Sequence, residues 1–152
     1  MTKTATAKTL NLLRTVQLYA QPTVTYEDYF KEAGVVWMGA GFRAQFLGLE
    51  IGVLESAELA VHRLTKALLD EEIFKELGGR DKAEISISQF VAFLSQNCKS
   101  RGWFVFYLRG GDGQLWAVCA YWLANDGGWS VDARSVAHPN GWPESFWVVS
   151  CN

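Results

Sequence analysis

The sequence predicts an α+β fold in a single domain, residues 1–152. Three observations predict it. The chain has 152 residues, 49% of them hydrophobic and 20% charged, which suits one globular domain. Apolar residues recur at helical spacing in the middle of the chain, and short apolar segments separated by glycine-rich turns follow residue 100. We therefore expect a C-terminal antiparallel meander of about four strands, packed with two to four helices and with N-terminal strands.

The N-terminal residues 1–8 are rich in Thr and Lys and contain no acidic residue. We expect a flexible end that leads into the first strand, with a transit peptide as the alternative. No continuous apolar core of the kind found in a secretory signal follows the two lysines, which argues against such a signal. Leu10–Leu18 is apolar enough for a strand or a helix, and Pro22 ends it.

A short helix and two strands are expected next. Thr25–Asp28 matches the [ST]-x-x-[DE] helix start, in which the hydroxyl and the acid satisfy free backbone N–H groups. Gly34 is a plausible end of that helix. Val35–Met38 predicts a buried strand, and Phe42–Leu47, which alternates loosely, predicts another.

The middle of the chain gives two competing patterns. Apolar residues recur at steps of three and four, which predicts a helix: Leu54, Ala57, Val61, Leu64 and Leu68. Alternation within residues 57–63 predicts a strand instead, and both alternatives stay open. Asp70 is expected to cap a helix over Glu71–Leu77, which Gly78-Gly79 ends. Ser86–Gln89 matches a capping box and predicts a helix after it.

The last third predicts the meander. Its expected strands are Trp103–Arg109, Gln114–Leu123, Trp129–Val136 and Ser145–Ser150. Glycine-rich turns at Gly110–Gly113 and Asn125–Gly128 join the first three, and turns of this kind connect antiparallel neighbours.

Several segments resemble a group of small uncharacterised bacterial proteins of unknown function. They are Thr25–Phe30, Leu69–Ile73, Gly128–Val131, Gly141-Trp142 and Val148–Asn152. The resemblance implies an α+β fold that ends in an antiparallel sheet, and it favours a strand near residues 57–63. It implies no catalytic residue.

The first two C-terminal strands are apolar on both faces, whereas the third alternates. Ser130, Asp132 and Arg134 share one face of the third strand. We expect the first two strands to be central, with helices covering one side and N-terminal elements the other. The alternative is that one face meets a partner, a ligand or a second copy of the chain.

Trp142 lies in the best candidate loop for recognition. Pro139 and Pro143 stiffen this loop, and Gly141 allows unusual backbone angles. With Trp129, Trp142 could form an aromatic platform for a sugar, a base or a protein side chain; the alternative is that Trp142 packs back over the sheet edge. The candidate binding residues are Trp129, Asp132, Arg134 and Trp142.

Catalytic patterns are sparse. The 3 cysteines form no CxxC pair, and the 2 histidines lie far apart in the sequence, so we expect no metal and no cofactor. A Cys151–His138 dyad is conceivable, but Cys151 lacks a helix N-terminus that would lower its pKa. Glu71, Glu72 and Glu76 predict a solvated helix face.

The expected function is that of a small, soluble, non-enzymatic binding protein that contacts a protein partner through an aromatic-rich sheet face or loop. Of its residues 7 are Trp, 9 Phe and 5 Tyr, and such rings are favoured anchors of interfaces. The net charge of -2 argues against nucleic acid, and no apolar run suits a membrane. Unpaired cysteines suggest the cytoplasm.

Two alternative functions remain: a module that stacks a sugar or nucleobase on Trp, and a small cysteine- or carboxylate-dependent enzyme. The expected protein partner could also be a second copy of the chain.

Overall fold

The computed structural model describes residues 9–20, 29–49, 51, 52, 54 and 56–151, with Tyr29 described by its backbone alone. The expected flexible end at residues 1–8 and the helix start at Thr25–Asp28 lie outside these residues. The strands are β1 (Leu10–Leu18), β2 (Val35–Met38), β3 (Ala57–Leu64), β4 (Trp103–Arg109), β5 (Leu115–Leu123), β6 (Gly128–Ser135) and β7 (Trp147–Cys151). The helices are α1 (Tyr29–Glu32), α2 (Ala40–Phe46), α3 (Asp70–Leu77), α4 (Arg80–Ala83) and α5 (Ile87–Gln96).

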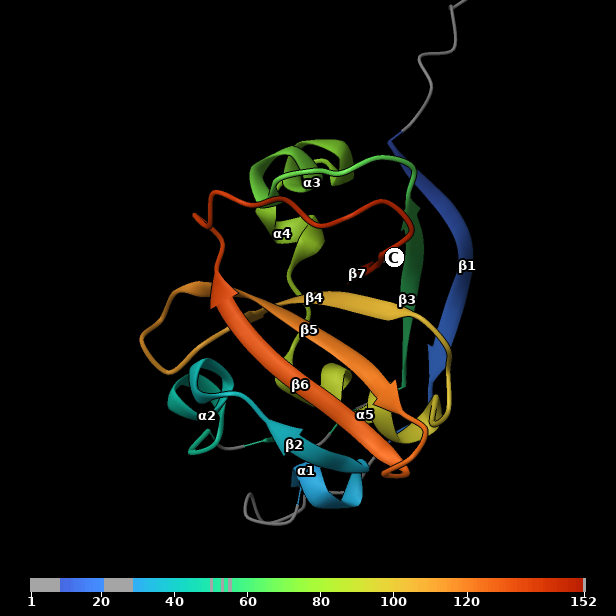
Figure 1. Ribbon diagram of the computed structural model, residues 1–152, viewed down its shortest axis with the longest axis vertical. Helices are drawn as coiled ribbons and strands as arrows, with labels where there is room; N and C mark the ends of the chain where they lie inside the picture. Colours follow the sequence, from blue (N-terminus) through green and yellow to red (C-terminus); the bar gives the residue numbers. More distant parts are fainter. Residues whose placement is uncertain (1–8, 21–28, 50, 53, 55, 152) are drawn as a thin grey trace, which may run out of the picture.

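In the described part of the chain, the seven strands form one mixed sheet in the order β1-β3-β7-β4-β5-β6-β2 (Figure 1). The strands β4, β5 and β6 follow one another through antiparallel hairpins, as the glycine-rich turns predict. Two pairs are parallel, β4 with β7 and β2 with β6. A mixed fold of helices and sheet is therefore confirmed, but the sheet is not the expected antiparallel meander.

The prediction that the last strand continues the meander is wrong. Instead of extending the sheet beyond β6, β7 lies between β3 and β4 and runs parallel to β4. Its Val148 and Val149 point to opposite faces and are both fully buried. A strand that is apolar on both faces is stabilised most at the centre of a sheet, and the long connection after β6 lets it reach that place.

Two further expectations about the helices are corrected. The predicted strand Phe42–Leu47 is the helix α2, because Phe42 and Phe46 lie four residues apart and are both fully buried on one helix face. Five helices are present in the described residues rather than two to four, since α1 and α4 are single turns of four residues.

Residues 57–63 belong to β3, so the helical stripe is the wrong alternative there. β3 pairs with β1 along one edge and with β7 along the other. These hydrogen-bonded neighbours stabilise a strand despite the helical spacing of the apolar residues. The capping box at Ser86 is confirmed, since its hydroxyl accepts from the Gln89 backbone N–H at 3.1 Å. Gly78 ends α3 at a positive φ of 98°, as expected.

The two faces of the sheet are covered by different elements. The helices α1, α2 and α5 cover one face, which we call the closed face; its buried aromatic residues are Phe30, Phe42, Phe46, Phe90, Phe93, Phe104, Phe106 and Trp129. α3 and α4 pack on the other face, together with the connection between β6 and β7. Figure 1 shows α3 and α4 gathered at one end of the sheet and α1, α2 and α5 at the other.

We call the second face the open face, because part of it over β4, β5, β6 and β2 stays exposed in the described structure. Trp103 of β4 and Trp37 of β2 are 43% and 53% exposed, respectively. The expected cover by N-terminal elements lies on the closed face instead, where α1 and α2 share the surface with α5. The candidate site therefore lies on the open face.

Candidate functional site

A stack of side chains runs across the open face. Trp103 packs between Tyr121, at 3.8 Å between ring centroids, and Phe146, at 5.3 Å. Phe146 in turn contacts Trp142, and the guanidinium of Arg134 lies 3.6 Å from the Trp142 ring centroid. These five residues form one continuous group, which we call the aromatic stack. The ring of Trp103 is nearly parallel to both neighbours, with interplanar angles of 28° to Tyr121 and 17° to Phe146.

The register of the sheet extends this surface to the edge. Trp103 is opposite Tyr121, Tyr121 is opposite Ser130, and Ser130 is opposite Trp37. Paired residues of neighbouring strands point to the same face, so these four side chains form one row across β4, β5, β6 and β2. The small Ser130, which is buried, separates the half-buried Tyr121 from the exposed Trp37.

A small pocket lies beside the end of the aromatic stack. Its volume is about 190 Å³, and its lining residues are Ala117, Cys119, Asp132, Ala133, Arg134 and Trp142. Three of the four candidate binding residues therefore meet here, because β6 presents Asp132 and Arg134 on one face and the connection before β7 brings Trp142 above them. The Arg134 guanidinium also donates to the Asn140 carbonyl at 2.8 Å, which fixes it over the indole.

Asp132 has a local structural role as well. Its Oδ1 accepts from the Ala133 backbone N–H at 2.8 Å. Its carboxylate lies against Gly39 and near Gly41, at the beginning of α2, where a Cβ on Gly39 would collide with it. The free N–H groups of a first helical turn favour a carboxylate. The Gly39–Gly41 segment thus lets α2 begin close to β6.

Trp129 does not belong to this site, and the expected platform of Trp129 with Trp142 is wrong. Trp129 is fully buried on the closed face, where its Nε1–H donates to the Leu94 carbonyl at 2.9 Å. Trp142 is 6% exposed and packs on the opposite face. The two indoles are separated by the sheet because Trp129 shares the closed-face alternation of β6. Trp142 packs back over the sheet, which is the second of the two expected alternatives.

Asp70 holds the Trp142 loop in place through a buried hydrogen bond to the indole. Its Oδ1 accepts from the Tyr107 hydroxyl and from Trp142 Nε1, both at 2.7 Å, and Asp70 is only 1% exposed. Burial raises the pKa of the Asp70 carboxyl, and the two hydrogen bonds and the Arg134 charge oppose that rise. The expected helix cap is therefore wrong: Asp70 begins α3, and Glu72 accepts from the Leu69 backbone N–H.

The thiols give little support to nucleophilic chemistry. Burial raises the pKa of Cys119 to about 12 and also raises the pKa of Cys151, so both are protonated at neutral pH. Cys151 donates to the Glu84 carbonyl and borders the closed-face core, whereas His138 lies in the connection that packs on the open face. The conceivable dyad of these two residues is therefore not formed.

Two negative findings concern the described residues only. Among them, no three His, Cys, Asp or Glu side chains come close enough to hold a metal ion. No helix in the described segments combines the length and apolar sequence that crossing a bilayer requires.

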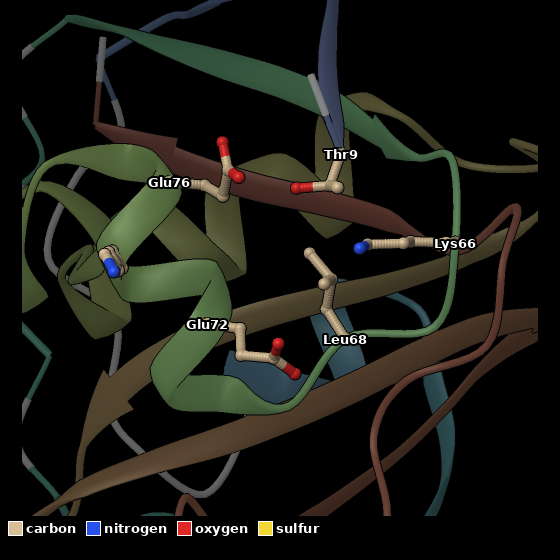
Figure 2. A pocket seen from close by; sticks show the side chains of 6 residues that line it. Thr9, Lys66, Leu68, Glu72 and Glu76 are labelled. Carbon is tan, nitrogen blue, oxygen red and sulfur yellow. The ribbon is translucent and has the colours of Figure 1, made fainter. Parts of the chain in front are cut away.

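A second, larger cavity of about 440 Å³ lies between α3, the start of β1 and the connection after β3. Figure 2 shows the carboxylates of Glu72 and Glu76 on the helix, with Thr9 and Lys66 on the other side. Opposite charges balance within this cavity, and Glu72 already accepts from a backbone N–H. Glu71, Glu72 and Glu76 are all exposed, as expected for a solvated helix face.

Comparison of the chain with protein-family models, with curated proteins and with solved structures gives no match. The site is therefore interpreted from its own geometry. Four of its residues were not among the candidates from the sequence: Trp37, Trp103, Tyr121 and Phe146. The two-sided apolar pattern of the first two C-terminal strands indicated part of this surface, but Trp37 and Phe146 reach it from segments far away in the sequence.

Proposed function

We propose that this protein is a non-enzymatic interaction protein and that its open aromatic surface, formed by Trp37, Trp103, Tyr121 and Phe146, binds a protein partner. The observation that carries the proposal is the exposure of two indoles in a single cross-strand row on one rigid sheet. Exposed Trp and Tyr on a sheet face supply large contact areas at small entropic cost, and they are enriched among residues that dominate binding energies.

The arrangement of the rings favours a protein over a planar ligand. A sugar or a nucleobase would stack on an open ring face, but Trp103 already stacks with Tyr121 and Phe146 within the protein. The Trp142 face is similarly covered by Arg134. Ring surface within the stack is therefore already used by its own members, and the part of Trp103 that stays exposed, 43%, is a surface against which side chains of another protein can pack.

A second copy of the chain counts as such a partner. β4 and β5 would contribute through their open-face side chains Trp103 and Tyr121, because both strands are paired along their two edges and carry core residues on the closed face. A cytoplasmic location belongs to the proposal, supported by the free thiols Cys98, Cys119 and Cys151. Relationship to the small bacterial proteins of unknown function is also proposed, on the sequence segments alone.

Site-specific photo-cross-linking in cells tests the proposed function. A benzophenone amino acid is placed at Trp37 or at Trp103. The matched control position is Tyr19, an aromatic residue that is 68% exposed and lies outside the open aromatic surface. We expect both surface positions, and not Tyr19, to cross-link to the same protein. A cross-linked dimer would identify a second copy as the partner. Equal cross-linking at all three positions would contradict the proposal.

A further inference from the structure

We propose that the pocket beside Arg134 holds one apolar side chain of the partner, and that Arg134 pairs with a carboxylate next to that side chain. The inference rests on the proposed function and specifies the partner segment that the surface recognises. Three observations support it: the volume of the pocket, the residues that line it, and the hydrogen bonds and ion pairs of its two charged residues.

The size of the pocket favours a single side chain. Its volume of about 190 Å³ is well below the roughly 300–1,000 Å³ of most small-molecule sites. A complete cofactor would not be enclosed, whereas one anchor residue of a larger partner would be. The pocket is also continuous with the aromatic stack, because Trp142 and Arg134 belong to both. Deep anchor positions surrounded by flatter contacts are typical of protein interfaces.

The lining of the pocket favours an apolar occupant. Ala117 and Cys119 form the floor from β5, and the indole of Trp142 forms a wall. The raised pKa of Cys119, about 12, keeps its thiol uncharged at neutral pH, so it acts as a small apolar group. A leucine-like side chain here would displace water from an apolar surface, which is favourable at about 25 cal/mol per Å².

The charges at the rim favour an acidic neighbour. Asp132 accepts from the Ala133 N–H and lies close to Gly39, at the start of α2. Arg134 forms no ion pair in the described structure, and its buried Nε has no hydrogen-bond partner there. Asp70 lies at the Nε1 edge of Trp142, whereas the guanidinium lies over the ring. Because Nε is buried and Nη2 already donates to the Asn140 carbonyl, a carboxylate would be met by the remaining N–H groups of the two terminal nitrogens, which the indole holds in place.

Capped dipeptides test the pocket directly. Acetyl-Leu-Asp-amide, acetyl-Leu-Lys-amide and acetyl-Gly-Asp-amide are titrated into the ¹⁵N-labelled protein, and the shifts of the Cys119 amide and the Trp142 indole N–H give dissociation constants. We expect the Leu-Asp probe to bind about tenfold more tightly than either of the others, the effect of one lost contact of about 1.4 kcal/mol. Equal binding of Leu-Asp and Leu-Lys, or shifts confined to other residues, would overturn the inference.

Two variants test whether the preference for the Leu-Asp probe comes from the charge of Arg134 itself or from the positive charge of the protein in general. Arg134→Gln should bind the Leu-Asp and Leu-Lys probes equally, while the control Arg43→Gln, at an exposed residue of α2, should keep the tenfold preference. If Trp37 cross-links a partner but the dipeptides show no preference, the pocket inference alone fails. If the dipeptides behave as expected but Trp37 and Tyr19 cross-link alike, the proposed function fails and the preference of the pocket stands.

Discussion

The closed face and the open face of the sheet use aromatic residues in opposite ways. On the closed face most ring pairs meet edge to face: Phe90 and Phe93, for example, contact Phe106 at 4.8 and 5.2 Å with planes 80° and 70° apart. On the open face Trp103 stacks nearly parallel to its neighbours. Both arrangements are favourable for aromatic pairs, so the cover by the helices, rather than the ring geometry, decides which rings stay exposed.

This difference shows why counting aromatic residues could not locate a site. The same residue types stabilise the fold on one face and remain available on the other, and the cover of the helices decides which. A substitution on the closed face should therefore affect mainly stability, and one on the exposed row mainly binding. The predictions below test that division, beginning with the largest expected change in stability.

Phe106→Ala should have the largest effect. Phe106 is fully buried and contacts rings from two positions of α5, so its truncation leaves a cavity that the rigid helix cannot fill. We expect a loss of about 3–5 kcal/mol in the free energy of unfolding, measured by urea denaturation. Phe106→Leu, which retains much of the volume, should lose clearly less. Equal losses in the two variants would show that the closed face is loosely packed.

Asp70→Ala should have the next largest effect, and it tests the covered end of the open face. It leaves the Tyr107 hydroxyl and the Trp142 indole N–H without their acceptor in the interior. Each such orphaned donor costs about 1–3 kcal/mol, and removal of a buried, desolvated carboxyl recovers part of the sum of the two, so we expect a net loss of about 2–4 kcal/mol in urea denaturation. Asp70→Asn is the matched control, because an amide oxygen can still accept both bonds. Similar losses in both variants would show that the charge, rather than the hydrogen bonds, holds the Trp142 loop.

Trp129→Phe should have a moderate effect on the closed face. The substitution keeps an aromatic ring but removes the N–H that donates to the Leu94 carbonyl in α5. We expect a loss of about 1–2 kcal/mol in thermal or urea unfolding, with the proposed partner still bound. Loss of partner binding in a folded Trp129→Phe protein would contradict the assignment of Trp129 to the core.

The pH dependence of stability should reveal the buried Asp70 carboxyl. Burial raises the pKa of this carboxyl in the folded protein above its value in the unfolded chain. At a pH between these two pKa values, the folded state holds a proton that the unfolded state has released. The contribution of Asp70 is therefore greatest below the unfolded pKa and declines as the pH rises through the folded pKa. Comparing the wild type with Asp70→Asn from about pH 3 to about pH 8 isolates it. A wild-type protein that gains stability over the variant as the pH rises would reverse the sign and contradict the burial argument.

The sequence predicted local features well and long-range ones poorly. The hairpins of β4, β5 and β6 and the capping box at Ser86 depend on residues close together in the chain. The position of β7 depends on burial between two distant strands, and no local pattern encodes it. Phe42 and Phe46 show the same limit, since a pair four residues apart in a seven-residue helix also fits a loosely alternating strand.

The candidate site was predicted in part for a similar reason. The alternation of β6 placed Asp132 and Arg134 on one face, and the structure brings them to one pocket with Trp142. Alternation also placed Trp129 on the other face, but a sequence alone does not show which face is covered. Trp37 joins the row through a parallel pairing of β2 with β6 across more than ninety residues of chain, which local spacing could not indicate.

Trp37→Ala should have the smallest effect on stability and gives the clearest contrast with Phe106→Ala. An indole that is 53% exposed at an edge strand loses little burial when truncated, so the free energy of unfolding should change by no more than about 0.5 kcal/mol. If the open surface binds a partner, the same variant should reduce cross-linking from a probe at Trp103 severalfold, because a large aromatic anchor has been removed from the row. Tyr19→Ala, which removes an exposed aromatic side chain elsewhere, should change neither quantity. Strong destabilisation of the Trp37→Ala protein would show that this indole contributes to the stability of the fold. The aromatic residues of the open face would then act as those of the closed face do, despite their exposure.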